Sequence, residues 1–174
     1  AAQKAQTRRE RQRGVSMPLA YIALGANLDD PVAQLHAALA ALATLPGSQL
    51  GNASSLYRTA PVGAPGQPDY INAVAALQTS LHPAALLAAL LDIEQRFGRR
   101  RDYHNAPRTL DLDLLLYDDD VIDQPGLQVP HPRLHLRAFV VVPLAEIAPD
   151  LRLPGRGSLA AWLPATSMQR IAKL

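Results

Sequence analysis

The pattern of apolar and polar positions along the chain predicts three strands before residue 81. Each segment is rich in apolar residues and is bounded by glycine, proline or short polar residues, which is typical of strands. The segments are LAYIALGAN (19–27), GNASSLYRTAPV (51–62) and DYINAVAALQTS (69–80). Alternation along the third segment would place Tyr70 and Asn72 on one face of the sheet.

Two further segments show the apolar spacing of helices. In residues 32–42 apolar side chains recur every three or four positions, after Asp30 and a proline that suit the N-cap and the first helical position. The second predicted helix covers residues 83–97, with Gly98 where a C-terminal cap is expected. Glu94 emerges on the apolar side of this helix near its end, which predicts a carboxylate paired with neighbouring arginines.

A run of leucines broken by two aspartates predicts the next strand, NAPRTLDLDLLLY (105–117). Because successive side chains of a strand point to opposite faces, alternate leucines from Leu110 to Leu116 would share one face. Asp111 and Asp113 would then lie side by side on the other face.

The order strand, helix, strand, strand, helix, strand predicts the α+β class. It is the order of the ferredoxin-like β-α-β-β-α-β core, an antiparallel sheet with both helices on one side. Beyond this core, RAFVVVPLAEI (137–147) is a continuous apolar run that we interpret as a further buried strand among C-terminal additions.

Composition and charge restrict the class of protein. With 174 residues, 48% of them hydrophobic, the chain is long enough for one folded domain, which we place at residues 17–174. Residues 1–16 hold five basic residues and one acidic residue, and we expect them to be a disordered basic extension or a cloning remnant. A nucleic-acid-binding arm is the alternative for this segment. The chain has no cysteine, which fits a reducing compartment, and its longest apolar runs are too short to cross a bilayer. We expect a cytoplasmic protein that acts as a monomer and has no membrane partner, and nucleic-acid binding is expected only under the alternative for residues 1–16.

The paired aspartates are the strongest sign of chemistry. Carboxylates at adjacent positions of one strand face repel each other unless cations, hydrogen-bond donors or water compensate. An exposed strand face is one explanation for Asp111 and Asp113. Mg²⁺ is the other, because it takes a few carboxylate oxygens and completes its shell with water and substrate phosphates.

Basic side chains flank these aspartates in the sequence. They are Arg99, Arg101, Arg108, His131 and Arg137. Since the guanidinium group matches phosphate oxygens, the arginines and a bound Mg²⁺ together predict a metal–nucleotide site. The chain has neither a G-x-x-x-x-G-K-[ST] phosphate loop nor a kinase-type glycine loop, which excludes the common nucleotide-binding architectures.

Six sequence strings resemble one known family. They are YIALGAN, YRTAPVG, PDYINAV, IEQRFGR, APRTLDLDLLLY and VPHPRLHLRAFVVVPL. In this order and spacing they resemble 6-hydroxymethyl-7,8-dihydropterin pyrophosphokinase of folate biosynthesis, from about residue 20 to residue 150. The resemblance implies transfer of pyrophosphate from ATP to the hydroxymethyl group of the pterin, with release of AMP, on a ferredoxin-like fold with added elements.

The resemblance also implies roles for individual residues. Asp111 and Asp113 would hold two Mg²⁺ ions. The implied ATP-binding residues are Glu94, Arg99, Arg101, Arg108, His131 and Arg137, with Arg99 and Arg108 catalytic. The implied pterin-binding residues are Thr59, Val62, Tyr70, Asn72 and Phe139. A flat pterin ring suits a slot between the aromatic faces of Tyr70 and Phe139. The ring edge would need the donor and acceptor of an amide such as Asn72.

The chain departs from part of the family in the segment 99–107, which would form a lid over the phosphates. Some relatives place tryptophan where this chain has Asn105, so Tyr103 is the candidate for the aromatic seal. Two alternatives stay open. One is another Mg-ATP-dependent transferase acting on a small heterocycle, and the other is a non-enzymatic ferredoxin-like binding module.

Overall fold

A computed structural model describes residues 17–61, 65–98 and 109–174 of the chain. The strands are β1 (Leu19–Ala26), β2 (Ser48–Ala53), β3 (Tyr57–Thr59), β4 (Tyr70–Thr79), β5 (Asp111–Tyr117), β6 (Ile122–Gln124), β7 (Leu127–Val129), β8 (Arg152–Leu153), β9 (Gly157–Ser158) and β10 (Ile171–Lys173). The helices are α2 (Pro31–Ala43), α3 (Pro83–Arg96) and α4 (Ala138–Ile147), with 3-10 turns at Leu134–Leu136, Leu159–Trp162 and Pro164–Thr166.

Six of the described strands form one antiparallel sheet, while β6–β7 and β8–β9 form two separate strand pairs. The strand order of the sheet is β10-β3-β4-β1-β5, and β2 also pairs with β4. The order β5-β1-β4 with β2 and β3 beyond is that of a ferredoxin-like sheet, and α2 and α3 connect its strands. The predicted fold class is therefore confirmed. The predicted helix start is also found, because the Asp30 carboxylate accepts a hydrogen bond from the Ala33 N–H at 3.3 Å.

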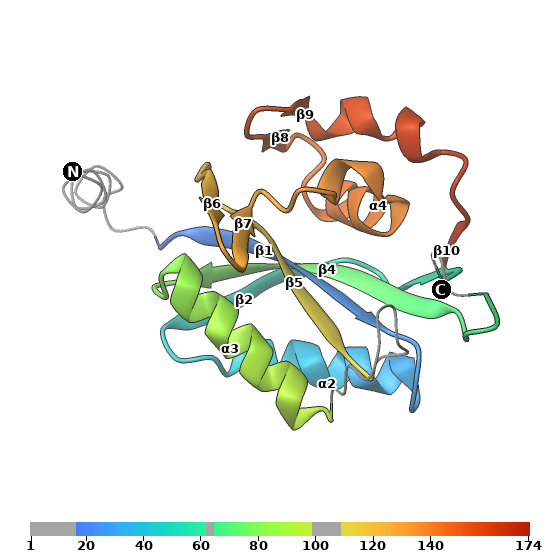
Figure 1. Ribbon diagram of the computed structural model, residues 1–174, viewed down its shortest axis with the longest axis horizontal. Helices are drawn as coiled ribbons and strands as arrows, with labels where there is room; N and C mark the ends of the chain where they lie inside the picture. The colour runs from blue at the N-terminus through green and yellow to red at the C-terminus, as the bar shows by residue number, and fades with distance from the viewer. Residues whose placement is uncertain (1–16, 62–64, 99–108) are drawn as a thin grey trace.

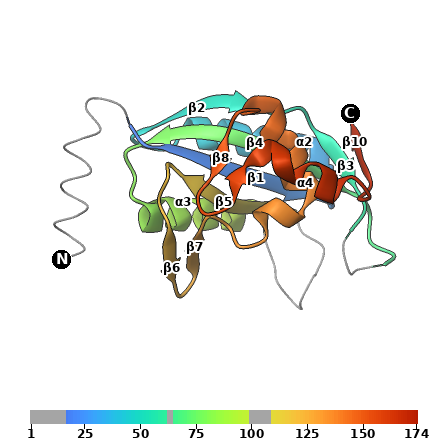
Figure 2. The same cartoon turned by 90° about the horizontal axis from the view of Figure 1, so that it is seen from above.

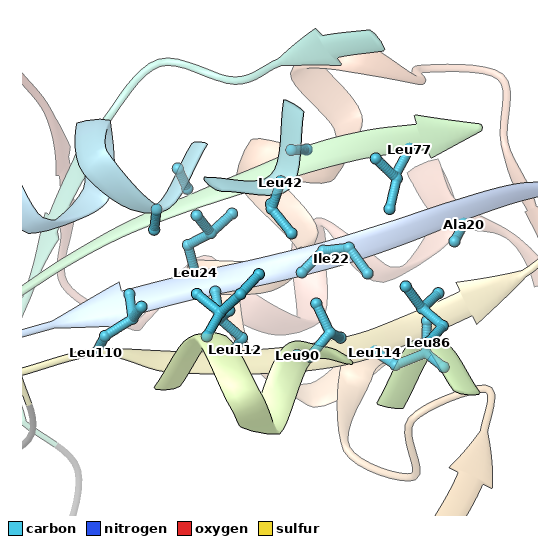
Figure 3. Close-up of a cluster of buried hydrophobic side chains, with 14 of the residues drawn as sticks. Ala20, Ile22, Leu24, Leu42, Leu77, Leu86, Leu90, Leu110, Leu112 and Leu114 are labelled. Atoms are coloured by element: carbon cyan, nitrogen blue, oxygen red, sulfur yellow. The ribbon is translucent and has the colours of Figure 1, made fainter. Parts of the chain in front are cut away.

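Helices cover both faces of the sheet (Figures 1 and 2). On one face α2 and α3 lie side by side, and their leucines pack against alternate residues of β1, β4 and β5 (Figure 3). On the opposite face, α4 and the C-terminal turns form a second apolar cluster that includes Val74, Leu116 and Val141. Within the described residues, no helix combines the length and the apolar character needed to span a membrane.

Three sequence-based predictions about local structure were wrong. The run RAFVVVPLAEI contains helix α4 and not a strand, since a continuous apolar run fits a buried strand and a buried helix equally well. The predicted strand 51–62 is instead divided between β2 and β3. Leu116 leaves the face of Leu112, because the pairing of β1 with β5 shifts by one residue at Leu115.

Candidate active site

The face of the sheet opposite α2 and α3 brings predicted pterin and metal residues into one row. Gly25 of β1 pairs with Asn72 of β4 on one side and with Asp111 of β5 on the other. In the next row Ala23 lies between Val74 and Asp113. Two strand spacings separate Asn72 from Asp111, which corresponds to about 9.5 Å between their Cα atoms.

Gly25 lets neighbouring side chains approach the middle of this row closely. A Cβ atom at this position would lie 3.0 Å from Oδ1 of Asn72 and 3.9 Å from Cδ1 of Tyr70. The absence of a side chain at Gly25 therefore makes room for the Asn72 amide close above the strand. Sequence analysis missed this residue, although a glycine inside a strand can signal the close approach of a ligand.

Asn72 and Thr59 form a buried polar pair on the pterin side of the row. The two residues are 5% and 6% exposed, and Nδ2 of Asn72 donates a hydrogen bond to Oγ1 of Thr59 at 2.6 Å. This bond orients the amide so that its acceptor atom, Oδ1, is the one nearest Gly25. Tyr70 is half-buried at the start of the same strand. Val62 lies outside the described residues.

A carboxylate on α4 fixes strand β3, which carries Thr59. Glu146 accepts a hydrogen bond from the Tyr57 hydroxyl and two from Ser55, through its N–H at 2.7 Å and its hydroxyl at 2.8 Å. Burial and the Glu146 interaction raise the pKa of Tyr57 to about 12. Tyr57 also pairs with Asn72 in the sheet. Its hydrogen bond to Glu146 therefore connects α4 directly to the strand pair that carries Thr59 and Asn72.

The start of α4 presents Arg137 and Phe139. The Arg137 guanidinium carbon lies 5.4 Å from the centre of the Phe139 ring, within the range of a cation–π contact. Phe139 is partly buried and packs against the second apolar cluster. Because α4 packs against β4, Phe139 and Tyr70 come from neighbouring elements on the same side of the sheet.

His131 lies close to the carboxylate side. Its backbone N–H donates a hydrogen bond to the Leu115 carbonyl at 2.9 Å. Its ring nitrogen Nδ1 accepts a hydrogen bond from the backbone N–H of Arg133 at 3.1 Å. Burial and the charge of Arg137 lower the pKa of His131 to about 4; Arg133 adds to the shift and Asp111 opposes it. His131 is therefore neutral at neutral pH, and it does not add to the positive charge that the arginines contribute.

A cavity of about 630 Å³ runs along the outer edge of β5. It is bounded by Leu87 of α3, by Asp113 of β5, by the β6–β7 hairpin and by His131. Its volume is within the range of small-molecule sites. The wall of the cavity includes both the apolar side chain of Leu87 on α3 and the Asp113 residue of β5.

Of the remaining predicted ATP-binding residues, Glu94 lies in the described part of the chain and three arginines do not. Glu94 is 1% exposed in the last turn of α3, the helix that packs against β5. Arg99, Arg101 and Arg108 lie outside the described residues, as do Tyr103 and Asn105. The basic segment 1–16 also lies outside them.

The donor set suits Mg²⁺ better than a metal that needs a protein cage. No group of three or more histidine, cysteine, aspartate or glutamate residues gathers for a metal among the described residues. Asp111 and Asp113 are both half-buried on β5. Two such carboxylates are a sufficient protein contribution for Mg²⁺, which keeps water and phosphate ligands.

Comparison with known proteins identifies the family. The family model of 7,8-dihydro-6-hydroxymethylpterin-pyrophosphokinase matches residues 21–149. The 2-amino-4-hydroxy-6-hydroxymethyldihydropteridine pyrophosphokinase of Pseudomonas aeruginosa is 48% identical over 154 residues, covering 88% of this chain and 95% of the relative. The enzyme of the same name from Haemophilus influenzae is 51% identical over 138 residues, covering 79% and 86%.

Solved structures share the fold. A crystal structure of wild-type HPPK-DHPS from Plasmodium falciparum matches with a TM-score of 0.69 at 13% identity, covering 85% of this chain and 44% of that chain. An HPPK-DHPS structure in complex with substrates matches with a TM-score of 0.67 at 12% identity, covering 86% and 43%. This chain thus spans less than half of those longer proteins. The family match and the identity to the two relatives show that the chain belongs to the 7,8-dihydro-6-hydroxymethylpterin-pyrophosphokinase family.

Proposed function

We propose that this chain transfers the pyrophosphoryl group of ATP to the hydroxymethyl group of 6-hydroxymethyl-7,8-dihydropterin and releases AMP, a reaction of folate biosynthesis. One structural observation carries the proposal in a chain of this family. A polar amide, Asn72, and a carboxylate, Asp111, lie in one row on the same sheet face, and the residue between them, Gly25, has no side chain.

The pterin would bind over the end of the sheet where β3 and β4 meet. Because the Thr59 hydroxyl takes up one N–H of the Asn72 amide, Oδ1 of Asn72 is oriented to accept an N–H from the edge of the ring. Tyr70 and Phe139 would bind the two faces of the ring. The hydroxymethyl arm would then extend across Gly25 towards Asp111.

The nucleotide would bind in the cavity along β5, with its phosphates towards Asp113 and His131. Asp111 and Asp113 would hold Mg²⁺, which when bound neutralises the phosphate charge and helps to align the reacting groups. Arg137 would add a cationic contact to the phosphates. Glu94, Arg99, Arg101 and Arg108 complete the proposed ATP-binding set, with Arg99 and Arg108 closest to the chemistry.

Positioning would supply most of the catalysis. The substrate hydroxyl oxygen loses its proton to the medium and forms a bond to the β-phosphorus while the bond from that phosphorus to the bridging oxygen, which leaves with AMP, breaks; the two oxygens are in line. Because Tyr57 and Glu146 hold β3 against α4, the strand that carries Thr59 and the helix that carries Phe139 keep a fixed relative position. We also propose that the enzyme is a cytoplasmic monomer.

The nucleotide product tests the proposal. Purified protein is incubated with ATP, MgCl₂ and 6-hydroxymethyl-7,8-dihydropterin, and the nucleotides are separated by chromatography. AMP formed in a 1:1 ratio with the pyrophosphorylated pterin is the expected result. ADP would instead indicate a transferase that moves one phosphoryl group. Removal of residues 1–16 should leave AMP formation intact. If the protein were instead a nucleic-acid-binding module that depends on this segment, the removal should abolish its binding and no AMP would form with or without the segment.

A further inference from the structure

The C-terminal segment returns to the start of α4 through the side chain of Gln169. Oε1 of Gln169 accepts a hydrogen bond from the Ala138 N–H at 2.9 Å. Nε2 of the same amide donates to the Leu136 carbonyl at 2.8 Å. The two bonded backbone groups flank Arg137 directly, so a single side chain binds the main chain on both sides of this arginine.

This contact replaces a missing helix cap. The first N–H groups of a helix have no partner within the helix, and a side-chain oxygen usually satisfies one of them. Arg137 occupies the N-cap position of α4 and provides no side-chain cap. Gln169, 31 residues after Ala138 in the sequence, supplies the acceptor for the first of these groups, the Ala138 N–H.

The same segment also reaches the pterin side of the sheet. Two residues after Gln169, strand β10 begins at Ile171, which pairs with Thr59 of β3. Near the end of the strand, the Lys173 ammonium lies 3.7 Å from the Glu146 carboxylate on α4. Residues 169–173 therefore connect the start of α4 to β3 on the other side of the proposed pterin site.

We propose that Gln169 is a positioning residue for both substrates. By fixing the peptide groups on both sides of Arg137, it restricts the backbone from which the side chain of this proposed phosphate contact extends. By capping α4, it also fixes the first helical turn, which carries Phe139. This inference rests on the proposed function, because it takes Arg137 as a phosphate contact and Phe139 as a pterin contact.

Three variants separate this role from a general effect on folding. Gln169→Met keeps the length of the side chain and removes both hydrogen bonds. Gln169→Glu keeps an acceptor for the Ala138 N–H but places a carboxylate oxygen against the Leu136 carbonyl. Met168→Ala is the matched control, since Met168 neighbours Gln169 and is 94% exposed.

The kinetic expectation is a loss in binding of both substrates. For Gln169→Met, kcat/KM for ATP and for the pterin should each fall about 10-fold, equivalent to roughly 1.4 kcal/mol. Most of the change should be in KM. The KM values of Gln169→Glu should lie between those of Gln169→Met and those of wild type. Met168→Ala should match wild type. All rates are compared at a temperature at which thermal melting shows every variant to be folded.

A second measurement does not depend on turnover. Amide hydrogen exchange at Ala138 should be faster in Gln169→Met than in wild type, while exchange in the central strands stays unchanged. Calorimetric titration with ATP and MgCl₂ should show weaker binding by a similar factor. If Gln169→Met matched Met168→Ala in ATP affinity or in Ala138 exchange, the positioning role would be wrong. If wild-type protein formed no AMP, the proposed function would fail, but exchange and titration would still decide the role of Gln169.

Discussion

Substitution of Gly25 by alanine tests, with a single added methyl group, whether this position belongs to the pterin site. The backbone at Gly25 is not in the left-handed region, so alanine can take its conformation without strain. The new Cβ would lie 3.0 Å from Oδ1 of Asn72, closer than ordinary contact. Asn72 can yield only by disturbing its 2.6 Å hydrogen bond to Thr59.

The effect on stability should be small. Disturbing one hydrogen bond costs about 0.5–1.5 kcal/mol. Replacing glycine restricts the unfolded chain and offsets about 0.4–1 kcal/mol of this cost. The net change in the free energy of unfolding is therefore within about 1 kcal/mol, or roughly 4 °C in Tm.

The effect on pterin binding should be much larger. The Cβ fills the space over which the hydroxymethyl arm would pass, and it displaces the amide that would read the ring edge. Loss of one or two such contacts corresponds to a rise of about 10-fold to 100-fold in KM for the pterin. KM for ATP should stay within about 2-fold, because the cavity proposed for the nucleotide lies along the outer edge of β5.

The assay is AMP formation with one substrate varied at a time, together with thermal melting. Gly51→Ala is the matched control: it is also a strand glycine, and its added Cβ would meet the Ala76 carbonyl at an ordinary 3.4 Å. Gly51→Ala should leave both KM values unchanged. An unchanged pterin KM in Gly25→Ala, with Tm also unchanged, would refute the assignment of Gly25 to the pterin site.

Other perturbations give further expected outcomes. Asp113→Asn should lower AMP formation by about 1,000-fold at every MgCl₂ concentration while Tm changes by only a few degrees, since a carboxylate ligand is lost without loss of core packing; near-normal turnover would exclude the metal role. Tyr57→Phe removes a hydrogen bond to Glu146 and should cost about 1 kcal/mol, read as a Tm lower by roughly 2–4 °C. Burial alone would raise the pKa of Glu146, but hydrogen bonds from Tyr57 and Ser55, with the charge of Lys173, outweigh it and lower the pKa below its ordinary 4.5. The stabilisation by this carboxylate is therefore present above pH 4.5 and is lost as the pH falls through the folded-state pKa. The Tm values of wild type and Glu146→Gln should accordingly converge in acid. If the two curves of Tm against pH stayed parallel, this expectation would be wrong.

Local patterns in the sequence were sufficient for most of the core. Helical spacing after Asp30 and Pro31 predicted α2, and the alternation of leucine with aspartate predicted that Asp111 and Asp113 face away from α3. These features depend on residues a few positions apart. The motif strings identified the family for the same reason, because they combine many local constraints in a fixed order.

Where the pattern was ambiguous, long-range packing decided the structure. The apolar run at 138–147 forms α4, which covers the open sheet face with side chains such as Val141. A strand would need free backbone partners at an edge of the sheet, whereas a helix satisfies its own backbone and can cover a face. The shift at Leu115 likewise arises from pairing with β1 and not from the leucine pattern itself.

The sequence by itself determined helices α2 and α3, the face on which each aspartate lies and the family. Only the tertiary structure showed that Gly25 lies between Asn72 and Asp111, that Glu146 binds Tyr57, and that Gln169 binds the backbone beside Arg137. The physical reason is that side-chain direction within a strand or helix follows from a local period, whereas the register between strands is fixed by the packing of the whole core.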